Sequence, residues 1–332
     1  MSTDLTIAVC DFWPRHQPDS NPVLASLRRH ADLAPARIPR ADLVVYSVFG
    51  RRHEAIRGTG LAVSGEPMLP PRRYAQWTID WRHLPHDHHL RLPFWAMVLA
   101  RPERERVLAD ERSALGDLSS VPERFCNFIY SNAGCEMRNA FFVALHSRRP
   151  VDALGSVFHN ADDARLSSRV DPAWSATKRT VLADYRFTIA FENEEHPGYT
   201  TEKMVDAWRA GSVPIYWGDP AVVADFPSGS YLSLYEAGSM SRLVEQVLEA
   251  EHEPERYRQL REANPLLTGV LGQRAAHYAA RLDEFSGRVI ADVEQHRGRR
   301  RPLTDIALRR PLQVAAAGAR GMRRSLALSV GR

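Results

Sequence analysis

The sequence lacks the features of a disulfide-rich or a membrane-spanning protein. It holds three cysteines in 332 residues. Cys10, Cys126 and Cys135 are widely separated, so a disulfide framework is not expected. The longest uncharged apolar stretch beside a predicted element, residues 93–100, is far shorter than the roughly 20 residues that span a bilayer. The first strand-like run has no basic leader and is interrupted by Asp11, so no secretory signal is visible. We therefore expect a protein of the reducing cytoplasm.

A metal-binding pattern is also missing. Many metal-dependent transferases hold Mg²⁺ or Mn²⁺ with Asp-x-Asp, and no such pair occurs in the chain. The His83–His89 segment contains four histidines, and its spacing could place two imidazoles on one metal. Nothing in the sequence completes such a site, so the favoured interpretation is a polar surface loop. We therefore expect no metal and no required cofactor.

The composition describes a soluble globular body with a basic tail. A chain that is 44% hydrophobic and 25% charged is ordinary for globular proteins, and its length suggests two domains. Residues 297–332 hold ten Arg and one Asp, so the formal net charge of +4 divides into +9 for this tail and −5 for the rest. Arginine pairs alternate there with apolar residues, which fits a basic amphipathic helix on an anionic membrane surface.

Two other interpretations of the tail stay open. It could be disordered, or it could contact nucleic acid. No aromatic residue is interleaved with its arginines, which argues against stacking on bases and hence against a nucleic-acid partner.

Short apolar runs that alternate with helical stretches predict two α/β domains. In the first half, strand-like runs occur at residues 5–9, 43–49 and 61–64. A charged and then polar stretch between Arg101 and Pro122 predicts a linker. We therefore expect an N-terminal domain over residues 1–105, a linker over 106–120, a C-terminal domain over 121–290, and a basic amphipathic or disordered tail over 291–332.

The clearest unit is a strand, loop and helix in the second half. Residues 187–191 predict a strand, and Thr200-Thr201-Glu202 predicts a helix start with a hydroxyl N-cap. Gly211 predicts the end of that helix. In a parallel sheet such a loop lies at the carboxyl edge, where a helix N-terminus and Lys203 favour a diphosphate. The alternative is that Glu202 completes a capping arrangement and Lys203 is solvated.

Three longer segments resemble the α1,3/α1,4-fucosyltransferases of glycosyltransferase family 10. They are Tyr185–Asn193, Pro197–Lys203 and Gly211–Pro220. Shorter pieces agree: Ser131-Asn132 with Arg138–Phe141, Asp152 with Gly155–Val157, and His89–Phe94. A match of about 36 residues with few gaps is far more specific than a lone glycine motif. The resemblance is weak over the first hundred residues and strong after residue 125.

The resemblance implies a GT-B architecture, in which two Rossmann-like α/β domains face a cleft and the C-terminal one holds the nucleotide. It implies that Arg138 and Lys203 neutralise the diphosphate of GDP-fucose. Asn193, Tyr199 and Glu202 would line the ribose and the fucose, and Thr201 belongs to the same donor-binding segment. The acidic stretch Glu194-Glu195-His196 departs from what is expected beside a diphosphate.

Glu66 stands where bacterial members carry their general base. By its position after a predicted strand, Gly65-Glu66 would reach the carboxyl edge of the first domain, with Gly65 permitting a sharp turn and Pro67 fixing the exit. The alternative is a surface glutamate in a turn, in which case Asp11 or Glu195 would be the next candidates for the base.

We therefore expect an inverting fucosyltransferase that moves L-fucose from GDP-fucose to a hydroxyl of an acceptor glycan, such as the 3-OH of a GlcNAc-type residue. The expected partners are GDP-fucose, an acceptor oligosaccharide or glycoconjugate, and the inner face of the cytoplasmic membrane. Two alternatives remain: a transferase for another GDP-sugar, and a catalytically silent nucleotide-sugar-binding protein.

Overall fold

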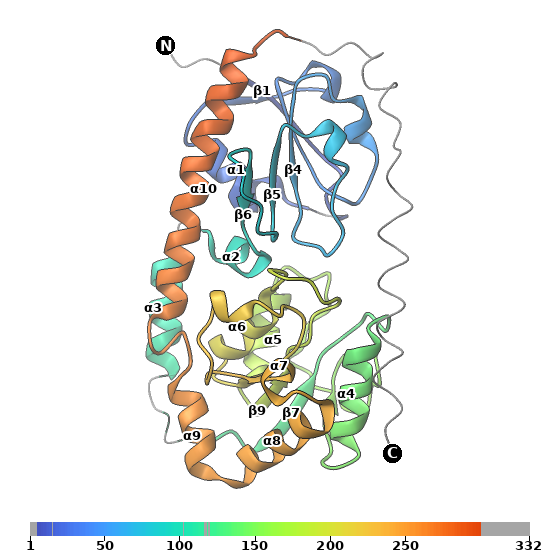
Figure 1. Cartoon of the computed structure of the whole chain (residues 1–332), viewed down its shortest axis with the longest axis vertical. Helices are drawn as coiled ribbons and strands as arrows, with labels where there is room; N and C mark the ends of the chain where they lie inside the picture. The colour runs from blue at the N-terminus through green and yellow to red at the C-terminus, as the bar shows by residue number, and fades with distance from the viewer. Residues whose placement is uncertain (1–4, 15, 102, 116–117, 119, 300–332) are drawn as a thin grey trace.

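The computed structural model describes residues 5–14, 16–101, 103–115, 118 and 120–299. The first part of the chain forms a parallel α/β domain (Figure 1). Its sheet has the order β2-β1-β3-β4-β5-β6. The strands are β1 (Leu5–Cys10), β2 (Leu33–Pro35), β3 (Leu43–Tyr46), β4 (Thr59–Val63), β5 (Trp77–Asp80) and β6 (His89–Arg91). Strand β3 is buried along its whole length, as its β-branched apolar sequence predicts for a strand covered on both faces.

The second domain is built around another parallel sheet, of order β11-β10-β9-β7-β8. Its strands are β7 (Arg124–Phe128), β8 (Asp152–Ala153), β9 (Tyr185–Ile189), β10 (Val213–Tyr216) and β11 (Leu232–Ser233). Its helices are α4 (Glu136–His146), α5 (Trp174–Leu182), α6 (Glu202–Arg209), α7 (Leu234–Ala237), α8 (Met240–His252) and α9 (Pro254–Glu262). Two parallel α/β domains were predicted from the sequence, and this is confirmed.

Helices α1 (Pro22–Leu27) and α2 (Phe94–Leu99) belong to the N-terminal domain. The carbonyl oxygen of the Asn21 side chain caps α1 by accepting hydrogen bonds from the backbone N–H groups of Val23 and Leu24, at 2.9 and 3.3 Å. Pro22 occupies the first helical position, where a missing N–H costs nothing. Helix α2 follows β6 and contacts α6 of the other domain, so it lies at the boundary between the two sheets.

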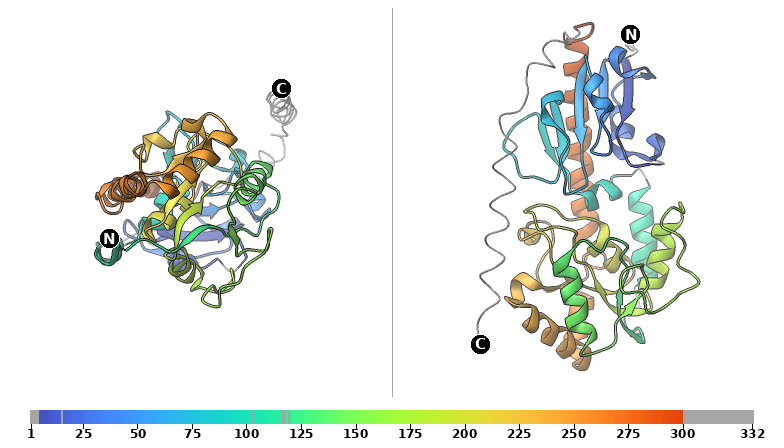
Figure 2. Two further views of the ribbon diagram at one scale, coloured as in Figure 1. Left: turned by 90° about the horizontal axis from the view of Figure 1, so that it is seen from below. Right: turned by 90° about the vertical axis from the view of Figure 1, so that its right-hand side faces the viewer.

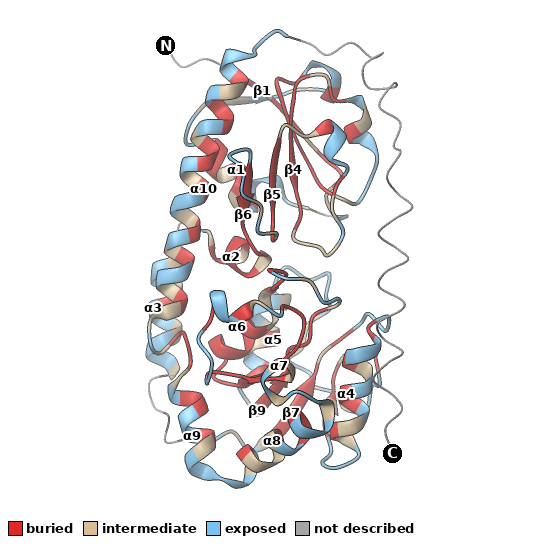
Figure 3. Ribbon diagram, in the orientation of Figure 1, coloured by how far each residue is buried: buried red, intermediate tan, exposed pale blue. Residues whose placement is uncertain are grey.

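A long helix, α10 (Val270–Gln295), returns from the second domain along the side of the first (Figures 1 and 2). Its buried residues recur every three or four positions, so they form one apolar stripe; they include Leu271, Tyr278, Phe285 and Val289. This stripe packs against α1, α2 and β6, and Figure 3 shows α10 as alternating buried and exposed bands. The predicted domain limits placed residues up to 290 in the second domain. Helix α10 packs along the first domain, and its Tyr278 hydroxyl also donates to Asp225 of the second at 2.8 Å.

The predicted linker contains most of a helix, α3 (Arg104–Leu115). Only Leu108 of α3 is buried among its described residues. Glu111 of α3 accepts two hydrogen bonds from the Arg209 guanidinium, both at 2.6 Å. Glu111 of the predicted linker therefore forms an ion pair with the second domain, whereas Arg106 pairs with Asp110 within α3.

One hydrophobic core joins the two domains. It contains strand residues of the first sheet, the stripe of α10, and Met204, Val205 and Trp208 of α6. A second core lies within the C-terminal domain around β7, β9 and α8. No helix among the described residues has the length and apolarity needed to cross a bilayer. The predicted basic tail lies outside the described residues from position 300 onward.

Candidate active site

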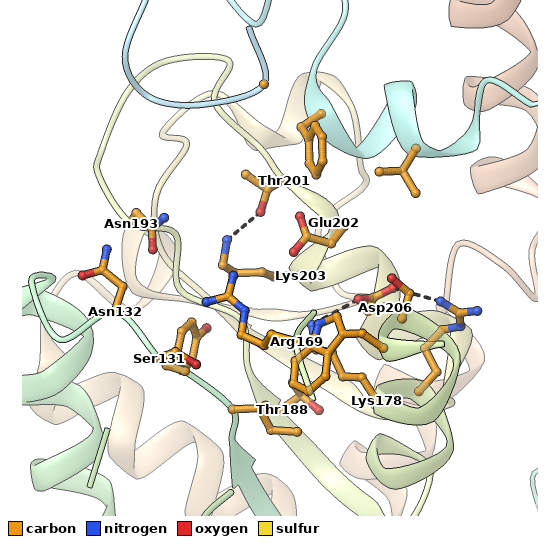
Figure 4. A pocket seen from close by; sticks show the side chains of 18 of the residues that line it. Ser131, Asn132, Arg169, Lys178, Thr188, Asn193, Thr201, Glu202, Lys203 and Asp206 are labelled. Carbon is orange, nitrogen blue, oxygen red and sulfur yellow. Dashed lines mark hydrogen bonds and ion pairs between the residues drawn. The ribbon is translucent and has the colours of Figure 1, made fainter. Parts of the chain in front are cut away.

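A cavity of about 500 Å³ lies where the carboxyl ends of the two sheets face each other. The N-terminal domain contributes residues after β4 and on α2, and the C-terminal domain contributes the loops after β7, β8 and β9 with the start of α6. Figure 4 shows this cavity, with Asn132, Asn193, Thr201 and Lys203 around its centre. The predicted residues that line it are Glu66, Asn193, Tyr199, Thr201, Glu202 and Lys203.

A buried ion pair lies in the floor of the cavity. The Lys203 ammonium donates hydrogen bonds to the Glu192 carboxylate and to the Thr201 hydroxyl, both at 2.7 Å. Glu192 also accepts from the backbone N–H and the hydroxyl of Thr201, at 2.7 Å each. The Glu192 side chain is fully buried and that of Lys203 is 15% exposed. The pair therefore fixes the start of α6 at the cavity wall.

The predicted hydroxyl N-cap of α6 is wrong in its detail. Thr201 does occupy the N-cap position, but its side chain makes no capping hydrogen bond. Its hydroxyl donates to Glu192 and accepts from Lys203 instead. The reason is that a charge-assisted hydrogen bond to a buried carboxylate is stronger than a cap to a neutral N–H. Gly211 ends the helix with a φ of 77°, as predicted.

The charged groups of this cluster shift one another's pKa values. Burial raises the pKa of Glu192, and the Lys203 ammonium partly offsets this. Burial lowers the pKa of Lys203, but the Glu192 and Glu202 carboxylates outweigh it, so the net direction is upward. Burial likewise raises the pKa of Glu202, but Lys203 and Lys178 outweigh it, and the net direction is downward. Lys203 is therefore held as an ammonium between two carboxyl groups.

Arg138 does not line the cavity. Its side chain is fully buried on α4, and its guanidinium lies 4.0 Å from the centroid of the Tyr130 ring. It donates to the Asn193 side-chain oxygen at 2.9 Å and to the backbone carbonyl of Asn132. Both asparagines line the cavity. In this structure Arg138 therefore holds two residues of the cavity wall and does not itself line the cavity.

Glu66 reaches the cavity from the N-terminal domain. The Trp81 indole N–H donates to the backbone carbonyl of Glu66 at 2.9 Å, and the Ser64 hydroxyl accepts from its N–H at 3.2 Å. Gly65 is required for a reason other than the predicted turn: a Cβ there would lie 2.4 Å from the Phe94 ring. Burial raises the pKa of Glu66, partly offset by Lys203.

The two fallback candidates for a base lie elsewhere. The Asp11 carboxylate accepts from the backbone N–H groups of Arg52 and His53, and it contacts the His53 imidazole at 2.7 Å. The Glu195 carboxylate accepts from the Trp217 indole at 3.0 Å. Neither belongs to the cavity wall. Both carboxylates have structural partners, so Glu66 is the carboxylate that the first domain presents to the cavity.

The described part of the chain contains no group of three metal-ligating side chains. Within the histidine segment, the buried His89 is bonded to the Thr78 hydroxyl and to the Arg82 carbonyl. The His88 ring stacks on Trp77, with centroids 4.2 Å apart. These histidines make separate contacts. All three cysteines are free and buried.

Several residues that line the cavity or pack directly behind its wall were not singled out from the sequence. Glu192 lies inside the Tyr185–Asn193 motif, directly after a predicted strand, and this position was its available signal. Lys178 and Asp206 form an ion pair at 3.1 Å on the wall formed by α5 and α6. Arg169 comes from the segment between β8 and α5, for which the sequence shows no periodic pattern.

Comparison with known proteins gives two family matches that together cover most of the chain. Residues 122–262 match the model of the C-terminal part of glycosyltransferase family 10 (fucosyltransferase). Residues 7–98 match the model of the N-terminal domain of the alpha-(1,3)-fucosyltransferase FucT. The chain belongs to glycosyltransferase family 10.

Individual relatives agree with this assignment. The alpha-(1,3)-fucosyltransferase FucT of Helicobacter pylori is 33% identical over 144 residues, which are 43% of this chain and 28% of that protein. The chain matches about a quarter of the length of the first curated relatives, at 28%, 23% and 27%.

Solved structures give the fold. A crystal structure of an alpha1,3-fucosyltransferase has a TM-score of 0.67 and 21% identity, over 85% of this chain and 91% of that chain. One with GDP-fucose has a TM-score of 0.63 and 23% identity, over 80% of this chain and 83% of that chain. The architecture is GT-B, as the sequence resemblance implied.

Proposed function

We propose that the chain transfers L-fucose from GDP-fucose to a hydroxyl of an acceptor glycan, with inversion at the anomeric carbon. The observation that carries this proposal is that a carboxylate from one domain and a cation from the other line the same cavity. A carboxylate with a raised pKa, Glu66, comes from the N-terminal domain. A buried cation at a helix start, Lys203, comes from the C-terminal domain. The proposed acceptor position is the 3-OH of a GlcNAc-type residue.

The donor is proposed to lie over the start of α6. A helix N-terminus and a nearby ammonium favour a diphosphate. Asn193, held in place by Arg138, supplies an amide beside it, and Tyr199 and Glu202 line the adjoining wall. An ionised Glu202 only accepts hydrogen bonds, so it suits sugar or ribose hydroxyls.

The proposed reaction is one displacement. The acceptor hydroxyl oxygen forms a bond to the anomeric carbon, and its proton passes to the Glu66 carboxylate. The bond from the anomeric carbon to the phosphate oxygen breaks, and its electron pair stays on that oxygen, so GDP leaves. The residues around Lys203 stabilise the charge that develops there. Attack opposite to the leaving group inverts the configuration.

The decisive experiment is a transfer assay with purified protein, labelled GDP-sugars and a panel of glycans that includes GlcNAc-terminated acceptors. We expect fucose to appear on an acceptor, and NMR of the product to show the configuration opposite to that of the donor. Transfer from a different GDP-sugar alone would favour the first alternative, a different donor specificity. Tight GDP-fucose binding without transfer to any acceptor would favour a silent binding protein.

We also propose that transfer needs no divalent metal. The support is the helix N-terminus with Lys203 at the proposed donor site, together with the missing Asp-x-Asp pattern. Incubation with EDTA should leave the turnover rate within about twofold of the untreated enzyme. Complete loss of activity, restored by Mg²⁺ or Mn²⁺, would contradict this and would point back to the His83–His89 segment.

The cellular setting is proposed from the sequence alone. We propose a cytoplasmic enzyme that associates with the inner membrane face through the basic tail. Ten arginines in residues 297–332 support this, because each basic residue near an anionic surface adds about 1 kcal/mol.

A further inference from the structure

Most cations of the cavity are already paired with carboxylates. Lys203 contacts Glu192 at 2.7 Å. Lys178 and Arg179 both contact Asp206, at 3.1 and 3.6 Å. Such pairs largely cancel their own charge, so they offer a diphosphate less attraction than their number suggests. The remaining cation of the predicted clamp, Arg138, is buried behind Asn193.

Arg169 differs from these cations. It lines the cavity from the segment between β8 and α5, it is exposed, and it makes no ion pair with a residue that the structure describes. Figure 4 shows its side chain extending across the cavity in the direction of Lys203 and Asn193. A guanidinium in this position has its hydrogen-bond donors available for a ligand.

The backbone on both sides of Arg169 is held in place. The Ser167 and Thr177 hydroxyls are 2.8 Å apart, and the Ser167 N–H donates to the Thr177 hydroxyl at 3.3 Å. The Asp171 N–H donates to the carbonyl of Ser168 at 2.8 Å. The segment therefore has little conformational entropy left to lose when Arg169 binds a ligand, which is the advantage of a preorganised site.

Arg169 and Glu66 line the same cavity, and the Arg169 side chain extends toward the donor-side residues Lys203 and Asn193. The charge of Arg169 acts to lower the pKa of Glu66, against the larger effect of burial. The base lies beside the bond that forms, and of the two donor phosphates the one that carries the sugar is the nearer to it. A cation that lines the same cavity as Glu66 and extends toward Lys203 therefore faces the sugar-bearing end of the diphosphate.

We propose that Arg169 binds the β-phosphate of the nucleotide sugar and stabilises the negative charge that this phosphate gains as the sugar leaves. This inference rests on the proposed function. When the acceptor oxygen bonds to the anomeric carbon, the electron pair of the broken bond stays on the β-phosphate oxygen. The Arg169 guanidinium donates charge-assisted hydrogen bonds to that phosphate, and GDP carries the electron pair away.

The test compares GDP with GMP, which lacks the β-phosphate. Isothermal titration of the full chain should show that Arg169→Ala weakens GDP binding by at least about tenfold, the effect of losing one charge-assisted hydrogen bond. GMP affinity should stay within about twofold of the wild type. The GDP affinity of Arg169→Lys should lie between those of the wild type and Arg169→Ala. In Arg169→Ala, kcat should fall as well as GDP affinity.

Two control variants separate this effect from others. Arg148→Ala removes an exposed arginine that is not part of the cavity wall, so it controls for net charge. Val170→Ala alters the exposed neighbour of Arg169, so it controls for disturbance of the segment. Both should bind GDP like the wild type, and all variants should unfold at the wild-type temperature.

The outcomes are distinguishable. GDP affinity unchanged in Arg169→Ala, or GDP and GMP weakened equally, would overturn the role of Arg169 while leaving the proposed function intact. A wild-type protein that does not bind GDP at all would overturn the proposed function and this inference with it.

Discussion

Glu66 combines a fixed backbone with a free carboxylate. Trp81 and Ser64 hold its main chain, whereas no hydrogen bond joins its carboxylate to a described residue. Glu66→Gln keeps the shape but cannot accept a proton. We expect kcat to fall by about 10²–10⁴, the usual contribution of a positioned base, and GDP affinity to stay nearly unchanged. Steady-state kinetics and calorimetry on the same preparation measure both.

The same residue predicts a pH dependence. A general base must be ionised, so activity is present above its pKa and is lost as the pH falls through it. Because burial raises the pKa of Glu66 above its ordinary value of 4.5, the acid limb of the kcat/KM profile should lie above pH 4.5 and vanish in Glu66→Gln. Near-normal turnover of that variant would show that Glu66 is only a turn residue.

The Lys203–Glu192 pair fixes the start of α6, and Lys203 also has the proposed role in donor binding. These two roles can be separated. Lys203→Met leaves a fully buried carboxylate without its cation, which typically lowers the free energy of unfolding by about 3–5 kcal/mol. Adding Glu192→Gln removes that charge and should recover most of the stability. It should not recover GDP affinity, because the ammonium is still missing. Urea unfolding and titration with GDP measure the two quantities.

Recovery of GDP affinity in the double variant would mean that Lys203 acts only by holding Glu192. A matched single variant, Glu192→Gln, shows how much of any change comes from the carboxyl group alone.

At this scale the sequence predicted six residues of the cavity wall, and five of them lie in the matching segments between Asn193 and Lys203. It could not predict that Arg138 is buried. An arginine on a helix is usually drawn to the surface, and its burial depends on Tyr130, Asn132 and Asn193, which meet it only in the folded chain. Arg169 could not be found either, since its segment has no recognisable pattern.

At the scale of elements, α10 connects the two domains. Its Phe285 ring is fully buried and packs edge-on against Trp77 of β5, with centroids 5.3 Å apart. Phe285→Ala should lower the free energy of unfolding by about 3–5 kcal/mol, as for other large-to-small core substitutions. Arg281→Ala, on the exposed side of the same helix, should change it by less than about 0.5 kcal/mol.

Thermal or denaturant unfolding monitored by circular dichroism measures this difference. Equal stability of the two variants would mean that the contact between α10 and the first domain adds little, contrary to its burial.

The sequence was more informative about α6 than about α10. Glu202 and Gly211 mark the two ends of α6 locally, and the N-cap position is correct even though the hydroxyl bonds elsewhere. For α10, an apolar stripe predicts burial but not its partner, because the stripe carries no information about which sheet it will cover. The sequence likewise does not show which residue a charge of the predicted linker will pair with. Glu111 pairs with Arg209, which is nearly one hundred positions away in sequence.

At the scale of the whole molecule, the tail can be tested apart from the enzyme. Removing residues 300–332 leaves every described residue in place. We expect the shortened chain to lose binding to vesicles that contain anionic lipid, while its turnover with soluble acceptors stays within about twofold. Co-sedimentation with vesicles of neutral lipid provides the control. Equal binding of both chain lengths to anionic vesicles would contradict a membrane role for the tail.

The path of the chain restricts how the two halves can move. It crosses from the first domain to the second through α3 and returns through the segment before α10. These crossings run near each other, since a Cβ on Gly269 would lie 3.9 Å from the Arg112 guanidinium. Bodies joined at a single point can rotate about any axis, whereas two tethers leave mainly a swing about the line that joins them. Because one hydrophobic core also joins the two domains, any movement between them should be a small rotation about that line. The loops carrying Glu66 and Lys203 should then keep the same alignment across the cavity.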